Sequence, residues 1–252
     1  MDERIAELFG IAAGQRMTYE EALEYFQSKL ALSPREFFRL RARYRALAFT
    51  VSGYASATVL KQFQDTLTKA IEDGTTLEQF RAGMNDWLKE RGYRGVTPYQ
   101  AENVFRTNLQ TAYNVGAYRQ MRSPAVLRDR PYWMYDAVED SHTRKSHLAM
   151  NGRVFPADSP VWDTWYPPNG FRCRCSVISL TEAQVRRMGL KVETEVPQRV
   201  DIGSGFISVR PDRGFGYNAA TVAYEPDLDG FPESIKTAYE RREREGREKS
   251  PV

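Results

Sequence analysis

The chain has 252 residues, of which 41% are hydrophobic and 27% are charged. These fractions are typical of globular proteins and exclude a disordered or fibrous chain. The length allows one large domain or two modest ones. The formal net charge is +3, from 36 basic and 33 acidic residues. A basic nucleic-acid-binding domain usually has a more concentrated excess of positive charge.

The sequence also bears on the cellular compartment. It contains no apolar run of roughly 18 residues, so we expect no transmembrane helix and no membrane partner. Residues 1–14 lack a basic segment before an apolar stretch, so we expect no secretory signal. The two cysteines cannot form a disulfide framework. We therefore expect the protein to work inside a cell, or inside a particle assembled there.

Residues 1–121 are predicted to form a helical region. Apolar residues recur at helical spacing in three stretches, which begin near residues 60, 77 and 104. Gly74 and Gly92 fall where two of the helices should end. Four pairs match the capping box, in which a hydroxyl is followed three residues later by Glu or Gln. These pairs are Thr18 and Glu21, Ser33 and Glu36, Thr75 and Glu78, and Thr97 and Gln100.

An arginine cluster lies within this helical region. Arg35, Arg39 and Arg43 follow the i, i+4 spacing of one helix face. Such a face could contact DNA phosphates or an acidic partner protein. It could equally be a solvated surface.

The composition changes after residue 121. Residues 122–180 contain six of the 13 prolines and three of the four tryptophans. Strands are predicted at 132–138 and 172–180, with a tight turn at Asn151-Gly152. Thr181 and Gln184 cap a last predicted helix. We expect an α+β protein, with a small loop-rich β-containing module at 122–190 and a C-terminal extension with a charged tail at 191–252.

All the histidines and cysteines of the chain lie in this module. They are His142, His147, Cys173 and Cys175. Three interpretations remain open. His147, Cys173 and Cys175 could hold a structural zinc ion, because Zn²⁺ favours thiolate and imidazole ligands. Alternatively, the cysteines are small buried hydrophobic residues and the histidines are polar residues of a tight turn region.

The third interpretation is an enzyme. Asp140, His142 and His147 are residue types used in acid–base catalysis, and a nuclease-like activity would use them on a phosphodiester. The basic residues that flank them could hold the phosphate. Because the chain shows no oxyanion-hole signature and no triad order, we favour a non-enzymatic role.

Four segments carry a family resemblance. They are 140–155 (DSHTRKSHLAMNGRVF), 162–175 (WDTWYPPNGFRCRC), 105–116 (FRTNLQTAYNVG) and 211–218 (PDRGFGYN). Together they resemble the Mu F-like minor head proteins of tailed bacteriophages. The matching structural-motif residues are Asp140, Thr143, Arg144, Gly152, Trp162, Trp165, Pro167, Pro168, Gly170 and Arg174. The resemblance covers about residues 45–220.

This resemblance implies a minor capsid or head-morphogenesis protein. Such proteins associate with the portal and with the major capsid or scaffolding protein in the procapsid interior, and some bind double-stranded DNA. The implied location is the virion head, with the host cytoplasm during assembly. Many relatives carry cysteines at the positions of Arg144 and His147, and a histidine at that of Gly170. This chain therefore retains His147, Cys173 and Cys175 as its matching ligands.

Overall fold

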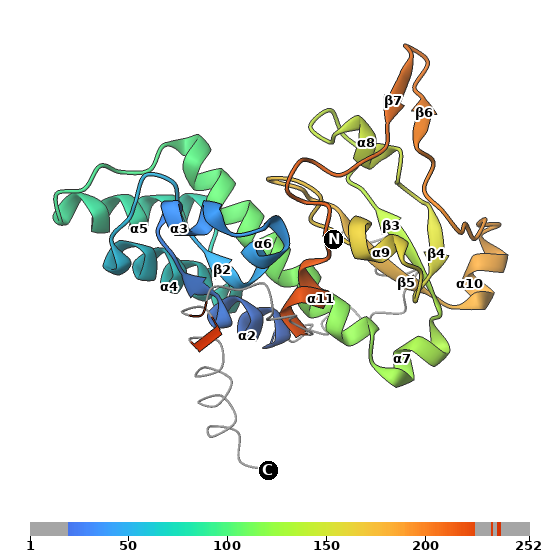
Figure 1. The fold of residues 1–252 in the computed structure, drawn as a ribbon, viewed down its shortest axis with the longest axis horizontal. Coiled ribbons are helices and arrows are strands. Elements are labelled where there is room, and N and C mark those ends of the chain that lie inside the picture. Colours follow the sequence, from blue (N-terminus) through green and yellow to red (C-terminus); the bar gives the residue numbers. More distant parts are fainter. Residues whose placement is uncertain (1–19, 225–232, 234–235, 238–252) are drawn as a thin grey trace.

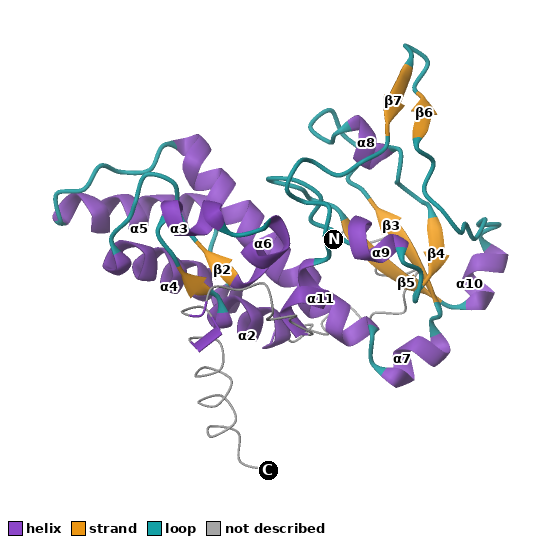
Figure 2. Cartoon of the chain, viewed as in Figure 1, coloured by secondary structure: helices purple, strands orange, loops and turns teal. Residues whose placement is uncertain are grey.

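The structure is a computed structural model that describes residues 20–224, 233 and 236–237. The described chain is an α+β protein, as the sequence predicts. A helical N-terminal part precedes small sheets and short helices (Figures 1 and 2). The predicted cap at Thr18 and the predicted charged tail lie outside the described residues, except for isolated positions at 233, 236 and 237. The domain boundaries at 121 and 190 stay predictions.

The N-terminal part contains five α-helices, a 3₁₀ helix and a two-stranded parallel sheet within the described residues. Its elements are α2 (Glu20–Ser28), β1 (Leu30–Ala31), α3 (Pro34–Arg39), η1 (Ala42–Leu47), β2 (Ala48–Phe49), α4 (Ala57–Asp73), α5 (Leu77–Glu90) and α6 (Pro98–Met121). The predicted apolar stretches form one core, in which Phe63, Leu67 and Phe80 are fully buried. These helices therefore hold together by packing apolar faces, as amphipathic helices do.

Local capping sets the helix boundaries. The caps at Ser33 and Thr181 are capping boxes, and the Thr97 hydroxyl accepts a hydrogen bond from the Gln100 backbone N–H. Gly74 ends α4 in the left-handed region, at φ 71°. The prediction at Thr75 is wrong by one residue, because the capping box of α5 uses Thr76 and Gln79. Thr75 and Thr76 both carry a hydroxyl, and Glu78 and Gln79 follow them at the same spacing of three residues. The sequence pattern of a capping box therefore fits either threonine.

The predicted continuous arginine face is also wrong. Leu40 ends α3 in an extended conformation, at φ −68° and ψ 144°. Arg43 lies in the separate 3₁₀ helix η1. Arg35, Arg39 and Arg43 are all exposed, but no single helix carries them.

The module that follows is built on a three-stranded antiparallel sheet. Its elements are α7 (Pro124–Asp129), β3 (Tyr132–Asp136), α8 (Lys145–Leu148), β4 (Val154–Pro156), α9 (Val161–Trp165), β5 (Ser176–Leu180) and α10 (Glu182–Arg187). The strand order is β4-β3-β5, with Trp133 opposite Phe155 and Ser179. The predicted strand at 172–180 begins only at Ser176, where its pairing with Asp136 of β3 starts. Arg172, at the start of the predicted strand, has a positive φ of 55°.

The region after residue 190 contains elements that the sequence does not predict. β6 (Arg199–Asp201) and β7 (Phe206–Ser208) form a short hairpin, and α11 (Ala219–Tyr224) packs against η1 and α6. The helix at Thr181 is therefore not the last one. Figure 1 shows the hairpin projecting from the module, while α11 returns to the helical part.

Helix α6 contributes to the two largest hydrophobic cores, one in the helical part and one in the module. The side-chain amides of Gln110 and Asn114 both donate to the Cys175 carbonyl, at 3.1 Å each. The Tyr166 hydroxyl donates in return to the Asn114 carbonyl, at 2.8 Å. These hydrogen bonds fix the Cys-Arg-Cys segment against the helical part. Among the described helices, none is long and apolar enough to cross a membrane.

Candidate metal centre

Three potential ligands meet in the interior of the module. His147 Nδ1 lies 3.5 Å from Cys175 Sγ and 3.7 Å from Cys173 Sγ. All three side chains are buried, and their ligand atoms lie within 4.8 Å of one another. A tetrahedral zinc ion with bonds of about 2.3 Å to sulfur and about 2.0 Å to nitrogen would separate N and S by roughly 3.5 Å. The group therefore fits a metal ion in both donor chemistry and spacing.

The backbone brings these ligands together from distant positions. His147 lies on the short helix α8, while both cysteines lie directly before β5. A turn at 170–173 places Cys173, whose N–H donates to the Gly170 carbonyl at 3.2 Å. From there burial alternates along the chain, so that both thiols face inward and Arg174 faces outward. This alternation is the period of an extended strand.

The pKa values of the two thiols shift in opposite directions. A hydrogen bond from the Cys175 thiol lowers the pKa of Cys173, and the nearby His147 lowers it further. The same hydrogen bond, together with burial, raises the pKa of Cys175. The pair therefore favours one thiolate, the form in which cysteine binds metals.

Aromatic side chains enclose this centre. The indole of Trp165 meets the His147 ring edge-on, with ring centroids 6.3 Å apart. The Tyr135 hydroxyl donates to Asn169 Oδ1 at 2.9 Å, and burial raises the pKa of Tyr135 well above its usual value. Among the described residues, His147 Nε2 is buried without a hydrogen-bond partner. The imidazole is thus held by packing and by its contacts with the thiols.

An ion pair supports the Cys-Arg-Cys segment from outside. Arg174 donates to Asp140 through two bonds, from Nη1 to Oδ2 at 2.7 Å and from Nη2 to Oδ1 at 2.5 Å. Arg174 Nη2 also donates to the Thr143 hydroxyl at 3.2 Å. The guanidinium holds the pKa of Asp140 well below its usual range. This ion pair acts as a clamp between two segments. One is the loop before α8, the helix that carries His147, and the other is the segment that carries both cysteines.

A second ion pair covers Gly170. Arg144 Nε lies 2.7 Å from Asp212 Oδ2, and Arg144 Nη2 donates to the Phe171 carbonyl at 3.0 Å. A Cβ atom at Gly170 would clash with the Asp212 carboxylate and would lie 3.0 Å from Arg144 Cζ. Glycine is therefore the residue that fits beneath this pair.

The remaining motif residues shape the loops around the centre. Trp162 Nε1 donates to the Pro156 carbonyl at 2.9 Å, and the Pro167–Pro168 peptide bond is cis. Gly152 has a φ of 73°, and its N–H donates to the Tyr135 carbonyl at 2.9 Å. The predicted turn at Asn151-Gly152 is therefore present, although the residues before it belong to α8 and a turn.

The nuclease-like cluster occupies three different environments. Asp140 is engaged by Arg174, His142 is exposed, and His147 is fully buried with Nδ1 directed at the thiols. Asp140 therefore belongs to the ion pair with Arg174, and His147 belongs to the group with the two thiols. The non-enzymatic role and its nuclease-like alternative both stay predictions.

Comparison with known proteins identifies the family. Residues 61–178 match the family described as Phage Mu protein F like protein. The chain is 32% identical over 216 residues to the Mu-like prophage FluMu F protein of Haemophilus influenzae, covering 73% of this chain and 52% of the relative. It is 29% identical over 254 residues to the capsid assembly protein F of Escherichia phage Mu, covering 86% of this chain and 57% of the relative. The chain belongs to the Mu F-like family.

This Mu F-like chain spans about half the length of the curated relatives that it matches. The matched region contains the whole of α5 and α6 and all three residues of the candidate metal centre. No solved structure matches the chain.

Several residues of this Mu F-like site escape prediction from the sequence. Asp212 stands out only as part of a resembling segment, and its partner Arg144 lies 68 positions earlier. Asn169 likewise stands out only as part of a resembling segment, and nothing in the sequence pairs it with Tyr135, although their hydrogen bond lies beside the thiols. No local pattern signals these pairings, because they form only when the loops fold over β3.

Proposed function

We propose that this chain is a minor structural component of a phage head that acts in head assembly without catalysing a reaction. The observation that carries this proposal is the similarity over 86% of the chain to the Mu protein named capsid assembly protein F. Its partners would be the portal and the major capsid or scaffolding protein, and its place the procapsid interior.

Deleting the gene from its own phage or prophage tests this role. Lysates would be examined by electron microscopy, with the wild-type gene returned in trans as the control. We expect the deletion to leave empty, aberrant or too few heads, and the wild-type copy to restore normal ones. Normal numbers of DNA-filled heads in the deletion would overturn the proposal.

We further propose that His147, Cys173 and Cys175 hold a structural zinc ion. Support comes from the N–S separations of 3.5 and 3.7 Å and from the buried, charge-sharing thiols. Zinc would cross-link a loop-rich module whose sheet has only three short strands. Only three such ligand atoms meet among the described residues, so a water molecule would complete a tetrahedral site.

DNA contact is a finer proposal, and it rests on the exposed side chains of Arg35, Arg39 and Arg43. These arginines would bind phosphates as separate charges, because they do not share a helix. Replacing all three with glutamine should weaken DNA binding and flatten its salt dependence. Unchanged affinity at low salt would remove the idea.

A further inference from the structure

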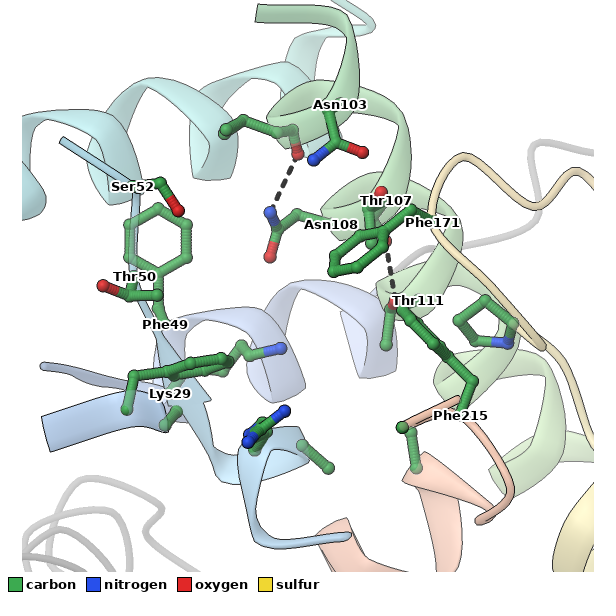
Figure 3. A pocket seen from close by; sticks show the side chains of 18 of the residues that line it. Lys29, Phe49, Thr50, Ser52, Asn103, Thr107, Asn108, Thr111, Phe171 and Phe215 are labelled. Carbon is green, nitrogen blue, oxygen red and sulfur yellow. Dashed lines mark hydrogen bonds between the residues drawn. The ribbon is translucent and has the colours of Figure 1, made fainter. Parts of the chain in front are cut away.

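A cavity of about 270 Å³ lies where the helical part meets the loop at Pro168–Phe171, and its lining does not include the thiol group. Its walls come from segments far apart in sequence: the region from α2 to β2, the first half of α6, the loop at Pro168–Phe171 and the segment before α11. Figure 3 shows Lys29, Asn103 and Phe171 around this one space. The volume lies near the lower end of ligand pockets, roughly 300–1,000 Å³, so one amino-acid residue would fill much of it.

The charge of the lining has one sign. Lys29, Arg45 and Arg213 line the cavity, and its described lining includes no aspartate or glutamate. Lys29 is only 5% exposed, and burial lowers its pKa to about 7. Burial disfavours the charged form of the lysine, and an anion in the cavity would stabilise that form.

Three residues of the lining carry a buried polar atom that lacks a hydrogen-bond partner. Arg45 Nε, Thr50 Oγ1 and Asn103 Oδ1 are buried and have no hydrogen-bond partner among the described residues. Buried polar groups are nearly always paired, so three such residues around one cavity indicate a site that offers hydrogen bonds to a bound group. Arg45 Nε can only donate, whereas Asn103 Oδ1 can only accept. A fitting ligand therefore carries both an acceptor and a donor.

Aromatic rings supply the rest of the wall. Phe49 is buried, while Phe38 and Phe171 are 55% and 52% exposed. The cavity thus combines phenyl rings, some buried and some exposed, with cationic donors and an amide acceptor. This combination suits an apolar group that bears one negative charge and one N–H.

We propose that this cavity binds the C-terminal residue of a peptide segment from another protein. The terminal carboxylate would meet Lys29 and Arg45, the terminal peptide N–H would meet Asn103, and an apolar side chain would pack among the phenyl rings. The site goes beyond the proposed role in head assembly and does not depend on zinc.

A titration with N-acetyl-L-phenylalanine tests this site in the full chain. Two-dimensional NMR would follow the amide signals of residues around the cavity, with N-acetyl-L-phenylalaninamide and phenyl phosphate as matched ligands. We expect saturable shifts at Thr50, Asn103 and Phe171, with the amide binding at least about tenfold more weakly because it lacks the charge. Equal binding of acid and amide, tighter binding of phenyl phosphate, or no shift at these residues would overturn the proposal.

Two short peptides distinguish the sources of the carboxylate. One ends in a free C-terminal phenylalanine, and the other is amidated and carries a glutamate side chain. We expect the first to bind more tightly, and the reverse order would contradict a C-terminal site.

Variants test whether the NMR shifts arise from binding in this cavity. Arg45→Gln and the rim variant Phe171→Ala should each weaken binding of N-acetyl-L-phenylalanine several-fold, whereas Arg41→Gln, at an exposed arginine outside the lining, should not. The second variant keeps the test informative if Arg45→Gln does not fold. Wild-type affinity in a folded Phe171→Ala and a folded Arg45→Gln would overturn the proposal.

Discussion

Arg174 and Asp140 form a two-point ion pair that joins both cysteines to the loop before His147. Both side chains are about one-third exposed. The pair therefore acts as a clamp at the surface of the module, while the thiols and the imidazole lie beneath it. The motif thus places its charged residues outside and its histidine and cysteines inside.

Asp140→Asn should lower the melting temperature, because it removes the charge that Arg174 pairs with. Since the pKa of Asp140 is lowered in the folded state, its stabilising effect is present above the unfolded pKa of about 3.9 and is lost as the pH falls. The difference in melting temperature between wild type and variant should therefore shrink below about pH 4. Thermal unfolding between pH 3 and pH 7 checks this, with the exposed Asp158→Asn as the control. A pH-independent difference would contradict the clamp.

Cys173→Ser should lose bound metal together with thermal stability. The protein as purified should contain about one zinc ion per chain, measured by elemental mass spectrometry. The exposed His142→Ala is the matched control and should keep its zinc. Chelator treatment of the wild type should lower its melting temperature to near that of the variant. Metal-free protein with an unchanged melting temperature would contradict the zinc proposal.

Gly170→Ala should destabilise the module by about 1–3 kcal/mol, the usual cost of overpacking. The new Cβ would push on the Asp212 carboxylate and on Arg144. In an Asp212→Ala background the same change should cost less, because one obstacle is gone. Gly83→Ala on α5 is the control, since nothing lies near its Cβ position, and it should be neutral or stabilising. An equal loss of unfolding free energy in both backgrounds would show that the Arg144–Asp212 ion pair does not restrict position 170 to glycine.

Lys29→Met should stabilise the ligand-free protein at neutral pH. Burial lowers the pKa of Lys29 to about 7, so between pH 7 and about 10.5 the unfolded state binds more protons than the folded one. The wild type should therefore gain stability relative to the variant as the pH rises through this range. Urea unfolding at pH 7, 8 and 9 measures the difference, with Lys69→Met on the surface of α4 as the control. A constant difference between wild type and Lys29→Met would contradict the burial of this charge.

Local patterns predict the long helices and the grouping of one histidine with the two cysteines. Periodicity and caps identify α4, α5 and α6, because those signals lie within one helix. The scarcity of histidine and cysteine, and their grouping in one module, point to His147, Cys173 and Cys175. In each case the information lies in a few neighbouring residues or in composition.

Long-range pairings cannot be predicted in the same way. The arginine spacing continues through Leu40, yet the backbone turns there and divides the expected face. The strands β6 and β7 have only three residues each, too few for a clear alternation. The cavity around Lys29 depends on Phe171 and Arg45, which come together only when the module loop packs against the helical part.

The most direct test of the head-protein account is mass spectrometry of purified particles. The full chain would be expressed from its own phage together with the portal and major capsid genes, and the heads purified away from free protein. The account predicts peptides of this chain in the heads at a few copies for each portal ring. Its absence from intact heads and from procapsids alike would contradict the account.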